Sequence, residues 1–419
     1  MTTVARRPTA ARPLPDLATT FLRWSFTRGL CARGYWLVAS LYLVVVADLS
    51  PSELVLVGSG QALVVVLAEV PAGVLADTVS RKWSLVLAHV VTGTGMVLAG
   101  LVTTFPALAL SQALWGLGWA FASGADVAWI TDELDRPDRI DRVLAARARW
   151  ELTGAAAGLV TFGALAWATD LGSAVVVSGL AMLGLGALVA LRFPERRFRP
   201  ALASRRWRAG IGVLRRGLRL ARHDRQILLV LAAWALVNGA GEGYGRLVER
   251  RLVGLGFGGT ASPILWFTAL GIATLALGAA ALRVVEGRIG GVDVARRTFV
   301  TCCAAGVVGL VLFAAAPDPR LAVVGTFLVS GSAHPGAVAR AVSEIWVNRR
   351  TTGDVRATVH SLLSQSEHVG EILFGVLLAA LAGATSLTVA LSGSVLLLAA
   401  AGVVASAGRG PRRAPVHGT

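Results

Sequence analysis

A regular series of polar residues interrupts an apolar segment near the C-terminal end of the chain. His360, Ser364, Glu367 and Glu371 follow one another at spacings of four, three and four residues, which puts all four on one face of a helix. Two carboxyl groups one helical turn apart in apolar surroundings resist ionising together, so such a pair tends to hold a proton. The pattern predicts a site that takes up and releases protons.

A second polar face combines aromatic residues with one acid. Gln112, Trp115, Trp119, Asp126 and Trp129 recur with helical spacing, and a surface of this kind suits flat apolar or cationic ligands. Packing alone is the simpler explanation for a stripe of tryptophans, but it does not explain Asp126. Because desolvation among tryptophans also favours a protonated carboxyl group, Asp126 is the competing candidate for the proton site.

Further ionisable residues lie inside apolar segments, where each costs about 2.5 to 3.5 kcal/mol to place in a membrane unless it has a partner or faces water. We expect them to line a shared cavity: Arg33, Glu69, Glu242, His334 and Arg340. Glu242 has an alternative, since Arg246 lies four residues later and suits a simple pair near the outer surface. His334 precedes Pro335 and Gly336, so we expect that helix to bend there.

The composition shows where these side chains must lie. The chain has 419 residues, of which 55% are hydrophobic and 15% charged, with a mean hydropathy of +0.67, whereas soluble domains carry roughly 25% charged residues. A soluble chain of this length needs polar surface that this one lacks. The formal charge of +16 does not indicate a nucleic-acid partner, because the arginines lie between apolar segments and no nucleic-acid module accompanies them. The composition is that of a membrane protein.

Twelve apolar windows are long enough to cross a hydrocarbon core of about 30 Å as helices. They form two sets of six, near 27–47, 54–76, 83–102, 106–130, 150–169 and 172–191, and near 226–245, 261–282, 297–316, 320–345, 357–381 and 384–406. We therefore expect an all-α membrane protein of about twelve transmembrane helices in two six-helix bundles. The expected division is an N-terminal bundle over 1–191, a basic cytoplasmic linker over 192–225, a C-terminal bundle over 226–407 and a cytoplasmic tail over 408–419.

The loops alternate between arginine-rich and arginine-free sequences, which gives the expected orientation. Arginines crowd 134–149, 192–225 and 347–356, whereas 48–53, 103–106, 168–173 and 382–386 have none. By the positive-inside rule, both termini and Ser204 lie in the cytoplasm, while Ser52 and Ser173 face the outside of the cytoplasmic (inner) membrane. Residues 245–257 dissent with three arginines on the expected outer side, and Arg320 is a second exception.

The linker over 192–225 is too charged to span a membrane. Its second half places leucines among arginines in the pattern of a basic amphipathic helix, which binds the surface of a bilayer. We expect it to lie on anionic lipid of the inner leaflet.

The sequence carries no motif for catalysis or for metal binding. We find no HExxH, no nucleophile elbow, no phosphate-cradling loop and no Cys/His metal spacing. The three cysteines, Cys31, Cys302 and Cys303, lie in or beside apolar segments and imply no disulfide framework. We expect no enzymatic activity, no cofactor and no metal.

The stretch from Gly73 to Lys82, GVLADTVSRK, lies where the second apolar segment ends. Its Gly, its Leu-Ala-Asp core and its Arg-Lys pair resemble the signature that the major facilitator superfamily carries between its second and third helices. The stretch departs from that signature at Thr78 and Ser80, where the family usually has Arg and Gly. Residues 121–134 and 347–365 resemble a subgroup rich in drug exporters.

The resemblance implies a gate around Asp77. The family places the N-terminus of the eleventh helix there, and in this sequence that helix begins at Gly353, with Asp354 as a suitable N-cap. The positive end of the helix would stabilise Asp77, and Arg81 would reach Asp132 at the end of the fourth helix. The gating residues implied in this way are Gly73, Asp77, Arg81, Lys82, Asp132, Asp354 and Arg356.

The resemblance also implies a secondary transporter that works by alternating access, as a monomer, with a small-molecule substrate and protons as its partners. We expect efflux of an amphipathic compound in exchange for protons. Two departures weaken the antiport expectation, because Gln112 stands where many exporters have Arg and residues 154–158 lack a Gly-Pro pair. An uptake symporter or a uniporter is the alternative. A membrane sensor or scaffold is the alternative from another class, although a scaffold has no need of ionisable residues facing a cavity.

Overall fold

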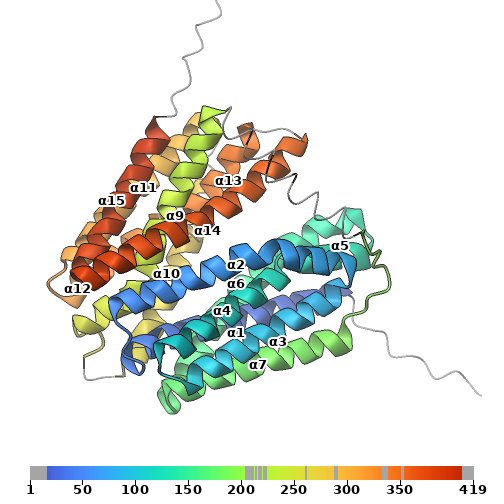
Figure 1. Ribbon diagram of the computed structural model, residues 1–419, viewed down its shortest axis with the longest axis horizontal. Helices are drawn as coiled ribbons and strands as arrows, with labels where there is room; N and C mark the ends of the chain where they lie inside the picture. The colour runs from blue at the N-terminus through green and yellow to red at the C-terminus, as the bar shows by residue number, and fades with distance from the viewer. Residues whose placement is uncertain are drawn as a thin grey trace, which may run out of the picture.

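The computed structural model describes residues 17–202, 224–259, 262–286, 291–332, 338–350 and 353–407, together with positions 212, 215 and 219. Regular secondary structure in these ranges is α-helical (Figure 1). The helices are α1 (Leu17–Val45), α2 (Pro51–Thr78), α3 (Arg81–Leu101), α4 (Phe105–Ala122), α5 (Ala125–Leu134), α6 (Pro137–Ala168), α7 (Leu171–Arg192), α9 (Arg225–Gly254), α10 (Pro263–Glu286), α11 (Val292–Ala315), α12 (Pro319–Ser332), α13 (Val338–Arg350), α14 (Gly353–Ala384) and α15 (Leu387–Ser406).

Short polar side chains begin several of these apolar helices. Ser50 accepts a hydrogen bond from the backbone of Glu53, whose carboxylate accepts one from the backbone of Ser50 in return, which is a complete capping box for α2. Ser80 caps α3 by accepting from Trp83, and Asp224 caps α9. Because a bilayer core offers no water to the first backbone N–H groups, such caps fix where each long helix starts.

The helices run up and down between two ends of the molecule. We call them the α1–α2 end, which holds residues 46–50, and the α2–α3 end, which holds residues 79–80. In Figure 1, α1 to α7 fill the lower right and α11 to α15 the upper left. The first set packs internally through α1 with α6 and α3 with α7, and the second through α9 with α14 and α15. Contacts between the sets run through α2 with α14, α6 with α10 and α2 with α9.

The buried core differs between the two ends. Toward the α1–α2 end one hydrophobic cluster joins both sets, with Val57 of α2, Tyr244 of α9 and Leu378 of α14 among its members. Toward the α2–α3 end the second set has a separate cluster, which includes Trp234, Phe299 and Trp346. The two sets are therefore joined by apolar packing at one end only.

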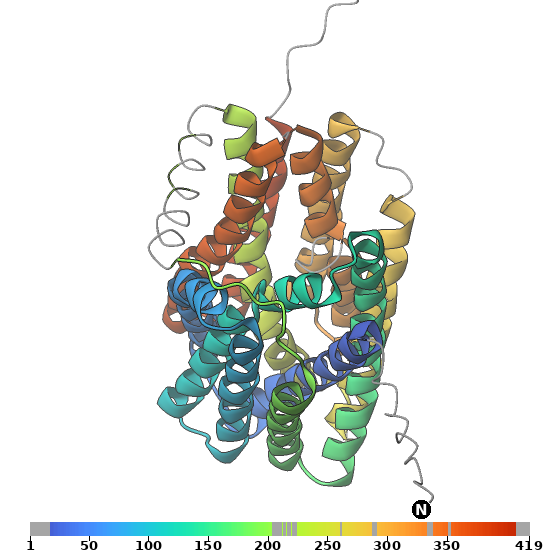
Figure 2. The ribbon, with the colours of Figure 1, turned by 90° about the vertical axis from the view of Figure 1, so that its right-hand side faces the viewer.

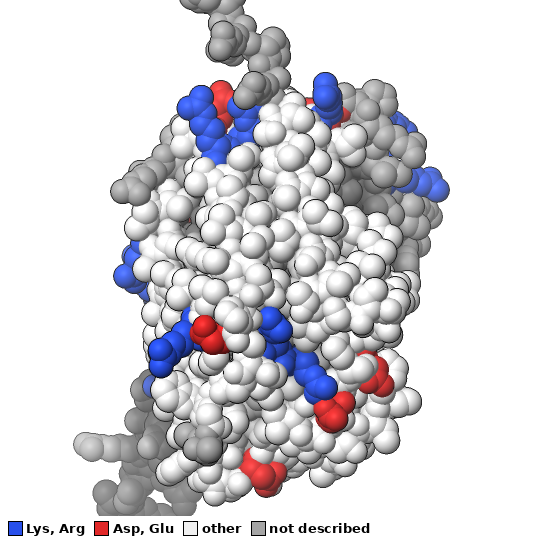
Figure 3. Space-filling view, turned by 90° about the vertical axis from the view of Figure 1, so that its left-hand side faces the viewer, with Lys and Arg blue, Asp and Glu red and all other residues white. Residues whose placement is uncertain are grey.

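Within the described residues, nine helices are long and apolar enough to cross a membrane. The other three expected spans correspond to α1, whose apolar half carries Arg28 and Arg33, to α4 with α5, and to α12 with α13. Uncharged residues cover most of the face seen in Figure 3, with charged side chains near its top and across its lower part. The expected bend at His334 falls in 333–337, outside the described residues.

The seventh expected span, 226–245, was too short, because α9 continues to Gly254. Its last turns hold the three dissenting arginines, and protein groups contact each of them. Arg246 contacts Glu242, Arg250 contacts Asp48, and Arg251 donates to the carbonyl oxygens of Ala314 and Ala316. These arginines therefore contribute to helix packing, and their presence does not indicate which side of the membrane this end of the protein faces.

The fourth expected span, 106–130, is broken. Gly124 adopts φ +74°, a left-handed conformation that favours glycine, and it separates α4 from α5. The face expected to run continuously from Gln112 to Trp129 is interrupted at this point.

Candidate functional site

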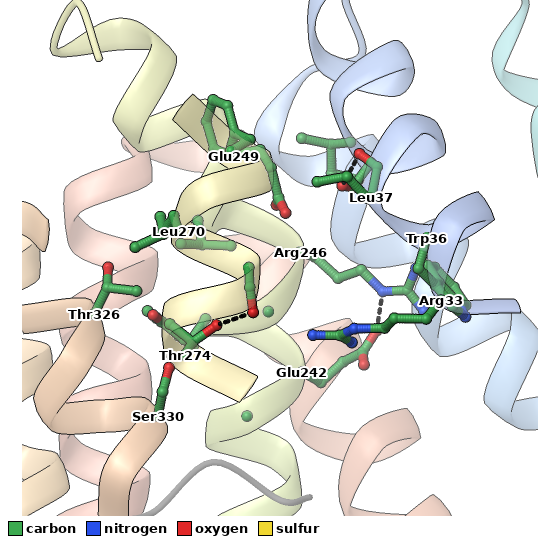
Figure 4. A pocket seen from close by; sticks show the side chains of 18 of the residues that line it. Arg33, Trp36, Leu37, Glu242, Arg246, Glu249, Leu270, Thr274, Thr326 and Ser330 are labelled. Atoms are coloured by element: carbon green, nitrogen blue, oxygen red, sulfur yellow. Dashed lines mark hydrogen bonds and ion pairs between the residues drawn. The ribbon is translucent and has the colours of Figure 1, made fainter. Parts of the chain in front are cut away.

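A cavity of about 390 Å³ lies between the two sets of helices, within reach of α1, α2, α6, α9, α10, α12 and α14 (Figure 4). Its lining combines charged, hydroxyl and apolar side chains. The charged members are Arg33, Arg246, Glu242, Glu249 and Glu371, and the polar neutral members include Ser40, Asn238, Tyr244, Thr274, Thr326 and Ser330. A concave site with an apolar wall and a few polar groups is the usual form of a small-molecule site.

Three charged residues of α9 face this cavity. Glu242, Arg246 and Glu249 follow at spacings of four and three, so they share one side of the helix. Arg246 Nε lies 2.9 Å from Glu242 Oε1, and its Nη2 donates to Gln61 Oε1 of α2 at 3.0 Å. Its guanidinium also lies 5.2 Å from the ring centroid of Trp36 on α1. The expected Glu242–Arg246 pair is present, and it borders the cavity and ties α9 to both α1 and α2.

Arg33 extends from α1 into the cavity beside the Glu242–Arg246 pair (Figure 4). Glu249 of α9 and Ser40 of α1 line the same cavity as Arg33, and the described residues show no ion pair between Arg33 and Glu249.

The polar series on α14 divides between two neighbours. Glu371 lines the cavity, and its Oε2 lies 2.9 Å from Nδ1 of His368. Glu367 lies 3.2 Å from Arg340 of α13, which also contacts Glu344. The two acids therefore have separate partners, which differs from the isolated pair expected from the sequence. Ser364 and His360 lie farther along α14 toward the α2–α3 end, and they are not among the described residues that line the cavity.

Glu69 links α2 to the same part of α14, because its carboxylate accepts a hydrogen bond from Gln365. Closer to the α1–α2 end, the hydroxyl of Ser59 donates to the backbone oxygen of Glu371 at 3.3 Å. The polar groups on α14 are therefore held against α2 along two turns.

Asp126 does not lie alone among tryptophans as expected, because it has two arginine partners. Its Oδ2 lies 2.6 Å from Arg147 Nη2 and 3.2 Å from Arg28 Nη1, and the carboxylate is nearly buried. Glu151 completes the network at 3.1 Å from Arg147. Asp126 is therefore part of a charged network that joins α1, α5 and α6.

The aromatic face keeps only part of the expected arrangement. Trp36, Trp115 and Trp119 follow one another with ring centroids 5.1 and 5.8 Å apart, and the last two are stacked. Trp129 belongs to the core instead, since it stacks on Phe193 at 4.1 Å. Gln112 is fully buried and donates to the Tyr35 hydroxyl at 2.6 Å, so it packs inside the first set of helices.

The expected gating residues meet at the α2–α3 end. Arg81 forms an ion pair with Asp132 of α5, and its Nη2 lies 3.4 Å from Asp77 Oδ1. The Lys82 ammonium lies 5.6 Å from the ring of Trp83. A Cβ on Gly73 would meet no atom within 4 Å among the described residues, so no close packing there requires glycine. The side chains of Asp354 and Arg356 are outside the described residues, and the contact between Asp77 and the start of α14 stays a prediction.

The segment after α7, residues 193–202, runs over this gate, as Figure 2 shows when the α2–α3 end faces the viewer. Glu195 accepts from the Ser80 hydroxyl at 2.5 Å and from the Lys82 backbone at 2.9 Å. The backbone N–H of Ala201 donates to the carbonyl oxygen of Asp77 at 2.9 Å. The first residues of the expected linker therefore pack against the α2–α3 loop, although the sequence indicated only a linker there.

Comparison with known proteins identifies the family. A family model described as Major Facilitator Superfamily matches residues 25–373. The chain belongs to the Major Facilitator Superfamily. Membership makes it a multi-pass membrane transporter and not an enzyme, in agreement with the nine apolar helices of the described residues.

Solved structures share the fold of this facilitator at low sequence identity. A mutant of the nucleoside transporter NupG has a TM-score of 0.77 at 16% identity, covering 94% of this chain and 100% of that one. A mutant of the peptide transporter POT in complex with sulfate gives 0.73 at 14%, covering 94% of each chain. A bacterial homolog of the human lysosomal transporter Spinster, inward-facing and unoccupied, gives 0.66 at 15%, covering 95% and 96%. No curated protein matches the sequence.

Sequence reasoning missed several residues that the facilitator brings into these sites. Glu249 was overlooked because the seventh span was ended before it, although its spacing of three from Arg246 was readable. His368 follows directly after Glu367 and sits three residues before Glu371, a spacing that also places it beside that acid. Arg28 and Glu195 carry no local signal, since their partners are 98 and 115 residues away. Arg147 has Glu151 four residues later, but its contact with Asp126 spans 21 residues.

Proposed function

We propose that this secondary transporter exports a small amphipathic compound and couples that movement to protons by alternating access. The observation that carries the proposal is the cavity between the two sets of helices, where carboxylates, arginines and Trp36 share the lining with leucines. Charged groups this deep in a membrane protein are costly unless they bind something or face water.

Proton coupling rests on Glu371 and His368. Glu371 lines the cavity and contacts the imidazole of His368. Histidine is the side chain that ordinarily exchanges protons near neutral pH. The backbone of Glu371 is also held by Ser59 across the junction of α2 and α14. A change of charge at this carboxylate therefore acts on the surface along which the two sets of helices meet.

We further propose the arrangement around this site. The N-terminal bundle comprises residues 1–191 and the C-terminal bundle residues 226–407, joined by the basic linker over 192–225, with anionic lipid as the linker's partner. Both termini, including the tail over 408–419, lie in the cytoplasm, and the α2–α3 end is the cytoplasmic end. The protein works as a monomer. Support comes from the arginine distribution and from the packing of α1 to α7 and of α9 to α15 among themselves.

The test begins with growth of cells with and without the protein on a panel of toxic amphipathic compounds. Compounds whose toxicity the protein lowers are then assayed in proteoliposomes that contain a trapped pH indicator. We expect substrate addition to drive proton movement, and we expect Glu371→Gln to abolish the pH dependence of transport. Asp293→Asn is the matched control, because its side chain is 78% exposed at the start of α11.

Each alternative predicts a distinct result in the same assay. Compounds that become more toxic with the protein present, with inward substrate movement along the proton gradient, indicate an uptake symporter. Transport with unchanged pH dependence in Glu367→Gln, Glu371→Gln and Asp126→Asn indicates a uniporter or another coupling ion. A sensor or scaffold predicts no movement of any compound.

A further inference from the structure

The guanidinium of Arg33 differs from the other arginines near the cavity in having no bonded partner. Arg246 is engaged by Glu242, Gln61 and the Trp36 ring. Arg33 makes neither a hydrogen bond nor an ion pair with any described residue, and it extends into the open space of the cavity (Figure 4). A guanidinium presents five N–H donors in a planar fork, a geometry that matches a carboxylate. An ionisable group that faces a cavity inside a membrane protein is by default a candidate binding group.

We propose, resting on the transport function above, that the substrates are small organic acids whose carboxylate binds Arg33. The acid enters the cavity with its anionic group toward α1. Its apolar body packs against the leucines and Phe267 on the other walls.

A second unsatisfied group faces the same cavity. The side chain of Asn238 on α9 is fully buried and lines the cavity, and its Oδ1 has no hydrogen-bond partner among the described residues. Its Nδ2 donates to the backbone oxygen of Trp234 at 2.8 Å, which fixes the amide with its oxygen as the unused acceptor. A buried acceptor without a donor costs free energy, so a ligand N–H or O–H at this point is favoured. The preferred acids therefore carry a donor on their body.

The remaining lining suits an apolar body of limited size. Leu37, Leu54, Leu159, Phe267 and Leu270 supply the apolar wall, and the cavity of about 390 Å³ is at the small end of the range for organic ligands. A compact aromatic acid fits these requirements better than a long or highly polar one.

Glu249 on α9 lines the same cavity as Arg33, and the described residues show no ion pair between the two. A carboxylate at this position repels a second carboxylate in the cavity. Removing its charge by Glu249→Gln should therefore strengthen binding of acids. Loss of the Arg33 charge should weaken the binding of acids. Opposite changes in affinity in the two variants distinguish direct binding from general damage to the cavity.

The experiment compares probes that share one skeleton and differ in charge. Indole-3-acetate is the anion, indole-3-acetamide is neutral, and tryptamine is the cation; 1-naphthaleneacetate is an acid without the ring N–H. Binding to the purified full-length protein is followed by thermal unfolding with a thiol-reactive dye. The three cysteines are buried and react as the protein unfolds. The midpoint measured at several ligand concentrations gives an apparent Kd.

We expect indole-3-acetate to stabilise the protein more than the amide or the amine does. Arg33→Gln should raise its Kd about tenfold or more, since a charge-assisted pair is lost, and Arg33→Lys should recover part of the affinity. Arg320→Gln, an exposed position at the start of α12, is the matched control and should leave the Kd unchanged. Asn238→Leu should remove the preference for indole-3-acetate over 1-naphthaleneacetate.

Three results would overturn the proposal: stabilisation by tryptamine above that by the acid, no stabilisation by either acid, or an unchanged Kd for the acids in Arg33→Gln. The binding measurement does not depend on whether the protein transports any compound. Acid binding that depends on Arg33, without movement of any compound in proteoliposomes, would keep this inference and remove the proposed function. Proton-linked transport of amphipathic cations without acid binding would do the reverse.

Discussion

At the scale of single residues, Asp126 shows how a buried charge is retained. Its carboxylate is shared by Arg28 and Arg147, whose guanidinium groups also lie near the aromatic rings of Trp24 and Phe21. Every member of this network depends on the others for its charge balance. The network therefore holds α1, α5 and α6 together near the α2–α3 end.

We predict that Asp126→Asn lowers the free energy of unfolding by about 3 kcal/mol, because it leaves two largely buried arginines facing an uncharged group. Thermal unfolding of the purified protein measures the change. A second substitution, Arg28→Gln, should restore part of the lost stability. Asp293→Asn, with its carboxylate exposed, serves as control. A stable Asp126→Asn protein would mean that the network contributes little.

Arg81 is the residue on which the gate prediction depends. It contacts Asp77 and Asp132 together, so Asp77→Asn and Arg81→Ala remove overlapping interactions. We predict that each substitution strongly lowers transport at normal expression, and that the double variant loses less than the sum of the two effects. Initial transport rates of the four proteins measure the coupling. Full activity of Asp77→Asn would contradict a gating role for this contact.

At the scale of helices, the sequence predicted the all-helical membrane architecture well, because apolar windows and arginine-rich loops are local features. It failed where a helix end depends on tertiary partners. The C-terminal part of α9 has the composition of a charged loop, yet Asp48 and the carbonyl oxygens of Ala314 and Ala316 bind its arginines within the fold. The break at Gly124 also escaped prediction, since glycine is common within transmembrane helices.

The candidate site was predictable only in part, for the same reason. The series on α14 and the Arg81–Asp132 pairing came from spacing and from family resemblance, and the structure shows Glu371 at the cavity and Arg81 against Asp132. The pairing of Glu367 with Arg340 rather than with Glu371 depends on how α13 packs on α14. No spacing rule within one helix contains that information.

The close contact of α2 with α9 requires the absence of a side chain at Gly58. A Cβ there would overlap Glu242 Oε1 and Arg246 Nε. We predict that Gly58→Ala separates α2 from α9 near the cavity, whereas Gly60→Ala, whose Cβ would meet no described atom within 4 Å, has no such effect. Spin labels on cysteines placed at two exposed positions, 63 on α2 and 228 on α9, report the separation of the two helices. Identical distance distributions in both variants would show that the contact is not restrictive.

The cap of α7 gives a pH-dependent contribution to stability outside the membrane-spanning segments. The hydroxyl and the backbone N–H of Ser173 both donate to Asp170, which lowers the pKa of its carboxyl group. A lowered pKa in the folded state means that the stabilisation is present above the ordinary value of roughly 3.9 and is lost as the pH falls through the lowered value.

We predict that Asp170→Asn keeps most of the cap, since Asn also caps helices, but removes this pH dependence. Asp170→Ala should cost about 1 kcal/mol at neutral pH. Unfolding midpoints of the three proteins between pH 7 and pH 3 provide the measurement. If the parent protein and Asp170→Asn lose stability in parallel, the cap does not titrate as described.

At the scale of the whole molecule, orientation is a property of the arginine distribution across all loops. We predict that cysteines placed at 52 and 173 react with an impermeant thiol reagent added outside cells, while a cysteine at 204 does not. Labelling with and without prior permeabilisation measures this. The buried native cysteines give a low background. The opposite pattern would reverse the proposed topology and place the gate outside.

The separate cores at the two ends would give the proposed alternating-access cycle a thermodynamic asymmetry. Opening the molecule at the α1–α2 end would pull apart the single cluster that contains Val57, Tyr244 and Leu378 and expose apolar surface to water. Hydration of such surface raises the heat capacity. The free-energy difference between the two open forms would therefore be a curved function of temperature. Opening at the α2–α3 end would leave this cluster intact, because the second set has its own separate cluster there. Cooling weakens the apolar cluster, so the balance between the two forms responds to temperature even when no substrate is bound.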